Sequence, residues 1–206
     1  MNCLRFLVAV CLPFSLLAEG GESSLERLIE GNQRYVSGAI SNKGSLKTKR
    51  DQLLSSQSPF AIILGCSDSR VPPEIVFDQS LGDIFVVRIA GNVVGLAEMD
   101  SILYAAEELH SSLIFVLGHE GCGAVKAFLD NSEDPDLADI SSQLKAAVKQ
   151  SKRVPGDLWM NAVKANVRLS VEKLKKQPVL QKLIKAKRLE IRGGYYELES
   201  GQVRLL

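Results

Sequence analysis

Three short, almost continuous apolar runs constrain the fold of this chain more than any other feature of its sequence. They occupy residues 60–65, 84–89 and 113–117. Each has the length of a strand and none alternates polar with apolar residues, so each is predicted to be a strand buried on both faces. Residues 97–109, between the last two runs, have helical spacing. Buried strands separated by helices are typical of an α/β domain with a mainly parallel central sheet flanked by helices.

The remaining elements are predicted from capping signals and hydrophobic spacing. Residues 23–26 (Ser-Ser-Leu-Glu) form a capping box that opens a helix, and Gly38 closes that helix. Further helices are predicted over residues 46–54, 121–129, 137–150 and 158–176, and a loop over residues 41–44. Closing strands are predicted over residues 189–198, including Gly193 and Gly194, and over residues 202–205, around a turn at residues 200–201. The last third of the chain is therefore expected to be helical first and then to return to the sheet.

The length of 206 residues suits one sizeable core rather than two. The formal net charge is only +1, and the lysines of the C-terminal helices are interspersed with acidic residues and lack an aromatic platform. A solvated helix face explains this pattern better than a nucleic-acid site. We therefore expect residues 21–206 to form a single domain that binds no nucleic acid.

The first twenty residues differ from the rest of the chain. A basic Arg5 is followed by an apolar run over residues 6–18 and by the small-residue pattern Ala18-Glu19-Gly20. This arrangement predicts a signal peptide over residues 1–20, because the run is too short to span a bilayer comfortably. The alternative is an amphipathic helix packed on a partner subunit, but the run is apolar all round. We expect an exported, periplasmic protein with no membrane span once the signal is removed.

The cysteines then reduce to two in the mature chain, Cys66 and Cys122. Cys66 ends the first predicted strand, and His119 and Cys122 follow the third, so all three are expected at the carboxyl edge of the sheet, where ligands bind in such folds. Two thiolates and an imidazole suit zinc, and three protein ligands leave the fourth position open, as in catalytic sites. A Cys66–Cys122 disulfide or buried structural side chains are the alternatives.

Two segments resemble the signature sequences of β-class carbonic anhydrases. They are Cys66-Ser-Asp-Ser-Arg70 and His119-x-x-Cys122-Gly123, and the resemblance extends over residues 31–35, 85–92 and 191–196. It implies a zinc enzyme, with one zinc per subunit, that reversibly hydrates carbon dioxide to bicarbonate and a proton by means of zinc-bound hydroxide.

The resemblance also implies roles for Asp68 and Arg70. Asp68 would accept a hydrogen bond from the zinc-bound hydroxide, and Arg70 would hold the carboxylate off the metal. In related enzymes the same aspartate sometimes closes the site as a fourth ligand, so Asp68 is also expected to act as a switch at low pH.

A substrate pocket follows from the resemblance as well. In the family it straddles a subunit interface, which implies a homodimer or a higher even oligomer. Its residues would be Gln57, Phe85, Ala90, Tyr104 and Gly123. For each of these the alternative is ordinary core or loop packing.

The chain departs from the family at one position of a known regulatory site. Some bacterial relatives bind an inhibitory bicarbonate through a Trp, an Arg and a Tyr; Arg88 and Tyr196 match, but Ile63 stands at the Trp position, which favours a constitutively open enzyme. His110 is expected to be solvent-facing rather than a proton shuttle. Trp159 is expected to be a packing residue.

Two other functions stay open at this point. Carbon disulfide or carbonyl sulfide would suit the same fold and metal, because pocket access would select among them. A non-catalytic zinc or redox protein would use Cys66 and Cys122 as a dithiol, but it needs neither Asp68 nor Arg70. The pair of charged residues therefore favours a catalytic site.

Overall fold

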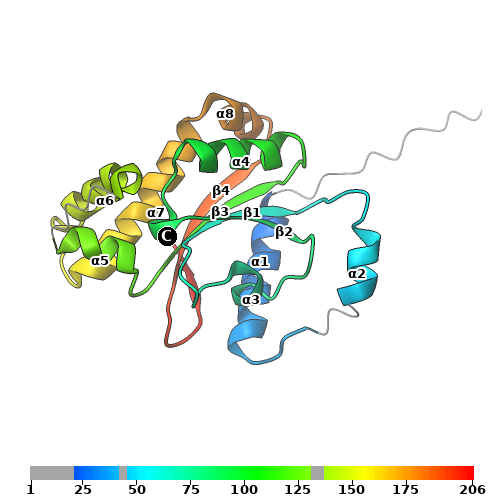
Figure 1. Cartoon of the computed structure of the whole chain (residues 1–206), viewed down its shortest axis with the longest axis horizontal. Coiled ribbons are helices and arrows are strands. Elements are labelled where there is room, and N and C mark those ends of the chain that lie inside the picture. The colour runs from blue at the N-terminus through cyan, green and yellow to red at the C-terminus, as the bar shows by residue number, and fades with distance from the viewer. Residues whose placement is uncertain (1–20, 42–45, 131–136) are drawn as a thin grey trace, which may run out of the picture.

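The computed structural model describes residues 21–41, 46–130 and 137–206. The predicted signal peptide and most of the predicted loop at 41–44 lie outside these ranges. The described chain forms a five-stranded sheet in the order β2-β1-β3-β4-β5 (Figure 1). Its strands are β1 (Ala61–Gly65), β2 (Ile84–Arg88), β3 (Leu113–His119), β4 (Glu190–Tyr196) and β5 (Val203–Leu205). The first four are parallel and only β5 is antiparallel, so the predicted mainly parallel α/β sheet is confirmed.

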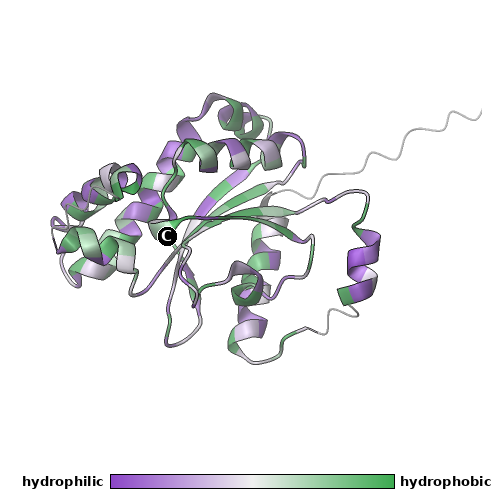
Figure 2. Cartoon of the chain, viewed as in Figure 1, coloured by the Kyte–Doolittle hydropathy of each residue, from purple (hydrophilic) through white to green (hydrophobic). Residues whose placement is uncertain are grey.

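The strands are apolar throughout because both faces of the sheet are covered. Side chains alternate across a strand, so Ile62 and Leu64 of β1 enter one hydrophobic cluster while Ala61 and Ile63 enter another on the opposite face. Every residue of β1 and β3 is buried. In Figure 2 the central strands are mostly coloured as apolar, whereas the helices around them mix polar and apolar residues.

Helices pack on both faces of the sheet and beside its carboxyl edge. α4, α7 and α8 share one cluster with the sheet, and α1 and α3 pack on the other face. α5 and α6 surround a third cluster at the carboxyl ends of the strands. The bounds are α1 (Gly21–Val36), α2 (Leu46–Gln52), α3 (Pro73–Val76), α4 (Leu96–Glu107), α5 (Gly123–Leu129), α6 (Ala138–Ser151), α7 (Leu158–Lys176) and α8 (Pro178–Lys185). None of these helices is long and apolar enough to cross a bilayer.

Two details at the ends of the chain differ from the sequence prediction. The capping box at residues 23–26 is wrong, because α1 already begins at Gly21 and the Ser24 hydroxyl lies 2.8 Å from that of Ser112 instead. Gly38 does follow the helix with the positive φ of 70° that favours glycine. The sequence analysis also missed α8, whose N-cap is the Gln177 side chain, directly after α7.

The predicted closing strand through Gly193 and Gly194 is confirmed, because β4 runs through both residues without interruption. Glycine is needed at Gly193, and at Gly118 of β3, because α7 lies close to the sheet. A Cβ atom on Gly118 would lie 2.5 Å from Val167 Cγ2, and one on Gly193 would lie 2.6 Å from Val167 Cγ1. Both distances are shorter than any normal contact, so these glycines set how close α7 approaches the strands.

Candidate metal centre

Cys66 is the first residue after β1, and its neighbours fix it at the edge of the sheet. The Gly91 N–H donates to the sulfur at 3.3 Å. The guanidinium of Arg88, the last residue of β2, donates to the carbonyl of Cys66 at 2.9 Å and to that of Asp68 at 2.6 Å. The turn after β1 is therefore held by the strand beside it, a role for Arg88 that the sequence analysis did not predict.

His119 and Cys122 come from one short turn between β3 and α5. His119 is the last residue of β3, Gly121 has a φ of +62°, and Cys122 is the N-cap of α5. Nδ1 of His119 lies 2.8 Å from the carbonyl oxygen of Glu120. Since a carbonyl only accepts, Nδ1 carries the proton and Nε2 is left with a free lone pair.

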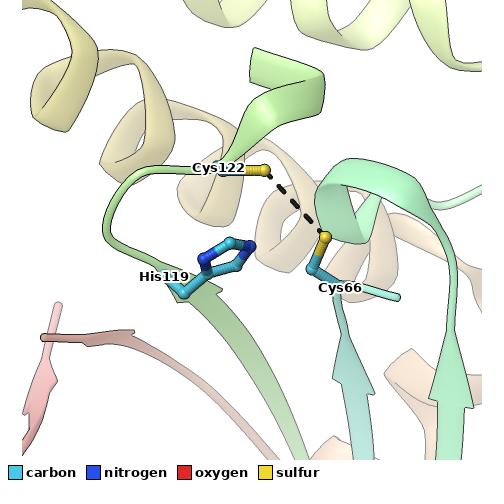
Figure 3. Close-up of side chains that lie close together, drawn as sticks. All are labelled: Cys66, His119 and Cys122. Carbon is cyan, nitrogen blue, oxygen red and sulfur yellow. Dashed lines mark hydrogen bonds between the residues drawn. The ribbon is translucent and has the colours of Figure 1, made fainter. Parts of the chain in front are cut away.

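The three predicted ligands meet in the structure, with the imidazole edge directed between the two sulfurs (Figure 3). Their ligand atoms all lie within 4.8 Å of one another, and all three residues are buried. The Nε2 atom of His119 is buried and has no hydrogen-bond partner among the described residues. A buried imidazole nitrogen without a partner costs free energy, so this arrangement is one that a bound metal would satisfy.

The two sulfurs are 4.0 Å apart and both cysteines are free. A disulfide would bring them to about 2.0 Å, so the dithiol form is the one present. Two sulfurs bound at about 2.3 Å by a tetrahedral zinc would lie roughly 3.8 Å apart. The observed separation therefore fits two thiolate ligands of one ion.

The electrostatics of the pair favour one thiolate. The hydrogen bond from Cys122 lowers the pKa of Cys66 to about 4, against the effect of burial and with help from His119 and the Gly91 N–H. The same contact with Cys66, together with burial, raises the pKa of Cys122. Cys66 is therefore the sulfur that loses its proton more readily, and binding of a soft cation would release the protons that the pair still holds.

Asp68 and Arg70 lie beside the three ligands and form a close ion pair. The guanidinium of Arg70 donates to Asp68 Oδ1 at 2.9 Å and to Oδ2 at 2.7 Å, and it also reaches the carbonyl of Gly121 at 3.3 Å. Oδ2 of Asp68 is 3.8 Å from Nε2 of His119, too far for a hydrogen bond. The hydrogen bond from Arg70, above all, holds the pKa of Asp68 well below its usual range, so this carboxylate stays charged beside the centre.

The predicted substrate residues fall into two groups. Ala90 packs against the same cluster as Cys66 and Cys122, and Gly123 directly follows Cys122 at the start of α5. Within one chain, Phe85 and Tyr104 are neighbours of each other, with ring centroids 6.3 Å apart.

Phe85 pairs with Ile62, four residues before Cys66, which places it about 13 Å back along the sheet. Gln57 is exposed in the segment before β1. Gln57, Phe85 and its neighbour Tyr104 are therefore not close to the cysteines of the same chain.

The structure also shows the surroundings of Tyr196, Ile63 and His110. Tyr196 contacts the Tyr35 hydroxyl at 3.2 Å, and Ile63 is fully buried in the sheet. His110 is exposed and precedes β3, so it lies at the opposite end of that strand from His119. A proton shuttle within one chain is therefore not formed by His110.

Trp159 does more than pack. It lies against the cluster that contains Cys66 and Cys122, as predicted, but its indole N–H also donates to the carbonyl oxygen of Cys122 at 3.0 Å. The sequence contains no spacing signal that links residue 159 to residue 122, because the contact depends on how α7 packs beside α5.

The comparisons with known proteins agree with this geometry. The family model described as carbonic anhydrase matches residues 61–203. Carbonic anhydrase 2 of Mycobacterium tuberculosis is 49% identical over 110 residues, and this aligned part spans only 53% of either chain.

Two solved structures share the fold. The β-carbonic anhydrase CcaA is 28% identical, with a TM-score of 0.69, and the match covers 89% of this chain and 95% of that one. A tetrameric β-carbonic anhydrase from Sordaria macrospora is 20% identical, with a TM-score of 0.70, and the match covers 89% and 96%; at that identity the likeness concerns the fold alone. By its matched family model, its cysteine–histidine cluster and its structural neighbours, the chain belongs to the β-carbonic anhydrase family.

Proposed function

We propose that this protein is a zinc enzyme that reversibly hydrates carbon dioxide to bicarbonate and a proton. The observation that carries the proposal is the buried Cys66–His119–Cys122 cluster with the Asp68–Arg70 ion pair beside it. A storage or redox site would need the cluster but not the ion pair. Three ligands also leave a coordination position for water, as in catalytic zinc sites.

Zinc is the ion that this donor set fits best. Thiolates favour soft or borderline cations, and an imidazole close to two thiolates is a ligand set typical of zinc. Held by Cys66, His119 and Cys122, zinc would act as a Lewis acid. It would lower the pKa of water far enough for hydroxide to attack carbon dioxide near neutral pH. Two thiolates donate more charge than imidazoles, so we expect activity to favour alkaline pH.

Asp68 would orient the attacking water. Because Arg70 engages both carboxylate oxygens, Asp68 stays beside the cluster as a hydrogen-bond acceptor. Its pKa is held far below the working pH, so it does not retain the proton released in the reaction. That proton must pass to solvent or buffer. Asp68 can become a fourth ligand only after Arg70 releases its carboxylate.

We further propose that a homodimer, or a higher even oligomer, completes the substrate pocket. Ala90 and Gly123 would line it from the same chain as the cysteines, whereas Gln57, Phe85 and Tyr104 would come from the partner. Tyr104 is 51% exposed in one chain, although it is a large aromatic residue, and a second copy would cover it. The Sordaria macrospora relative is itself tetrameric.

Mixing two inactive variants tests this pocket. If Gln57 acts across the interface, dimers of Gln57→Ala with Asp68→Asn contain one intact site, and mixing the two purified variants restores part of the activity. If Gln57 acts within its own chain, no mixed dimer has an intact site and activity does not return. Size-exclusion chromatography with light scattering, run in parallel, gives the oligomeric state.

We also propose that residues 1–20 direct export to the periplasm and are then removed. The proposal rests on the basic start, the apolar run and the small residues at 18 and 20. An intact mass of the protein recovered from the periplasmic fraction tests it, because cleavage after Gly20 leaves a chain that starts at Gly21. Full-length protein in the cytoplasmic fraction would contradict it.

Stopped-flow hydration of carbon dioxide tests the main proposal directly. The zinc-loaded mature protein is expected to catalyse hydration at alkaline pH, and removal of the zinc by a chelator is expected to abolish catalysis until zinc is restored. A zinc-loaded protein that is folded and oligomeric but inactive above pH 8 would overturn the proposal. Parallel assays with carbonyl sulfide and carbon disulfide would reveal a different preferred substrate.

A further inference from the structure

Helix α7 passes beside the candidate metal centre and extends two side chains toward the segments that carry its sulfur atoms. Trp159 lies in the first turn of α7 and Asn166 lies seven residues later, so both occupy the same face of the helix. Trp159 contacts the turn of Cys122, and Asn166 contacts the turn that holds Cys66. One helix thus contacts the main chain that positions each thiol, although the two thiols follow different strands.

Trp159 acts on Cys122 through the main chain. The carbonyl of Cys122 accepts from the Trp159 indole N–H at 3.0 Å and from the Lys126 N–H at 3.0 Å. The Lys126 ammonium also lies 5.8 Å from the centre of the indole ring. With two donors on its carbonyl, the peptide after Cys122 has a fixed orientation, and this limits where the Cys122 side chain can point.

Asn166 acts on Cys66 through Gly91. The Asn166 side chain is fully buried; its amide donates to the Gly91 carbonyl at 2.6 Å and its oxygen accepts from Gln143 at 2.8 Å. Gly91 in turn donates its N–H to the Cys66 sulfur at 3.3 Å, in a left-handed conformation with a φ of +71°. Gly91 is therefore held at its carbonyl by α7 while its N–H holds the sulfur.

We propose that Trp159 and Asn166 are positioning residues, which set the orientation of the two sulfur ligands of the metal. This inference rests on the proposed function, because it concerns the same metal. Groups that hydrogen-bond behind metal ligands typically change metal affinity or activity by 10- to 100-fold when they are removed. Here both supports come from α7, so the packing of this helix against the sheet controls the spacing of the two sulfurs.

The substitution Trp159→Phe tests the first support, since it keeps an aromatic ring in the cluster and removes the N–H together with part of the indole ring. The matched control is Met160→Leu, at the next position of α7 and in the same cluster. We expect zinc affinity, measured by competition with a chromophoric chelator, to fall about tenfold in the Phe variant and to stay at the wild-type value in the control. A Phe variant with wild-type affinity would overturn the role of Trp159.

Cobalt substitution gives a readout that core packing alone would not change. The absorption that arises from sulfur-to-cobalt charge transfer depends on how each thiolate is oriented at the metal. We expect its intensity or position to change in Trp159→Phe and to stay as in the wild-type protein in Met160→Leu. An unchanged cobalt spectrum in a variant with a lowered thermal midpoint would mean that Trp159 is only a packing residue.

Asn166→Leu tests the second support, with Ser170→Ala as its control because Ser170 donates from the same helix to the carbonyl of Asn92. If Asn166→Leu does not fold, Asn166→Asp keeps the acceptor for Gln143 and removes the donor to Gly91. The expected result is again weaker zinc binding and a changed cobalt spectrum, in the Asn166 variants only. Wild-type binding and spectra in these variants would overturn the role of Asn166.

The wild-type protein separates this inference from the proposed function. If wild-type protein gives no two-sulfur cobalt signature, the proposed metal centre itself is wrong. If it gives that signature and Trp159→Phe and the Asn166 variants match it, only the positioning role is wrong.

Discussion

The two ends of the central parallel strands show opposite ways of handling polar groups. At the amino end, the Ser111 hydroxyl donates to the Pro59 carbonyl at 2.7 Å, and Ser112 is joined to both Phe60 and Ser24. At the carboxyl end, a few residues further along the same strands, His119 keeps a buried nitrogen without a partner among the described residues. The two serines at the amino end are therefore paired within the chain, whereas the imidazole at the carboxyl end is arranged for something that the described residues do not supply.

This difference separates stability from function within one sheet. Satisfied buried hydrogen bonds stabilise the fold, whereas an unsatisfied buried group costs about 1–3 kcal/mol. Changes at the amino end should therefore alter the free energy of unfolding and leave activity intact, and changes to the candidate ligands and Asp68 at the carboxyl end should do the reverse. Three predictions test this division, beginning with the largest expected effect, and a fourth tests a contribution to stability from a neighbouring tyrosine.

Replacement of His119 by Gln is expected to abolish most of the activity. The loss of one of three ligands should lower carbon dioxide hydration by on the order of 10³-fold or more, because the metal no longer acidifies water effectively. Urea unfolding of the metal-free protein should change by less than about 1 kcal/mol, since Nε2 has no partner among the described residues and the Gln amide can replace Nδ1 as the donor to the Glu120 carbonyl. A large loss of metal-free stability would contradict the division.

Asp68→Asn is expected to lower hydration by about 100-fold, as is typical when a group that positions a reacting molecule is lost. Asp83→Asn is a close control, because both aspartates are ion-paired and each side chain is 17% exposed. Asp83 lies just before β2, at the amino end of the sheet, and its loss should change activity less than about twofold. Equal losses in the two variants would indicate that charge alone, rather than position, matters.

Ser111→Ala is expected to destabilise the protein without affecting catalysis. The Pro59 carbonyl would lose a buried donor, at a cost of about 1–2 kcal/mol in the free energy of unfolding. Ser101→Ala is the control, because Ser101 donates to Ala97 within an exposed part of α4 and Ala is the better helix former. Urea titrations and activity assays on the same samples measure both effects; reduced activity in Ser111→Ala would break the comparison.

Tyr195, at the carboxyl end of β4, gives a pH-dependent test. Burial first, and then the charges of Glu120 and Asp157, raise its pKa to about 12. The unfolded tyrosine ionises near pH 10, so this contribution to stability is complete below pH 10 and is lost as the pH rises through 12.

Between pH 9 and pH 11 the wild-type protein should therefore lose about 1 kcal/mol more stability than Tyr195→Phe. Urea unfolding at the two pH values measures this difference. Parallel losses in the two proteins would contradict the assignment of the shift to Tyr195.

The sequence was sufficient to predict the features that depend on local pattern. Continuous apolar runs predicted β1, β2 and β3, and the positions of Cys66, His119 and Cys122 directly after two of these strands predicted that their side chains would meet. Asp68 and Arg70 are two residues apart, so their contact also followed from local geometry.

Features that depend on packing between distant segments could not be predicted in this way. The bonds from Trp159 to Cys122 and from Asn166 to Gly91 join residues 37 and 75 positions apart. The helix α8 was missed because it begins immediately after α7, with Gln177 capping it. The reason for a glycine at position 193 of β4 was also missed, because glycine ordinarily weakens a strand and only the closeness of α7 explains its presence there.

That closeness has a mechanical consequence for the chemistry. Val167 of α7 packs directly against the backbone of Gly118 and Gly193. The same helix carries Trp159 and Asn166, the proposed positioning residues of the two sulfurs. Any side chain added at either glycine would lift the helix, and with it both supports, away from the strands that end at the ligands. The geometry of the metal centre therefore depends on two positions that do not contact the metal. Gly118 and Gly193 contribute by having no side chain, which lets α7 pack close to the strands.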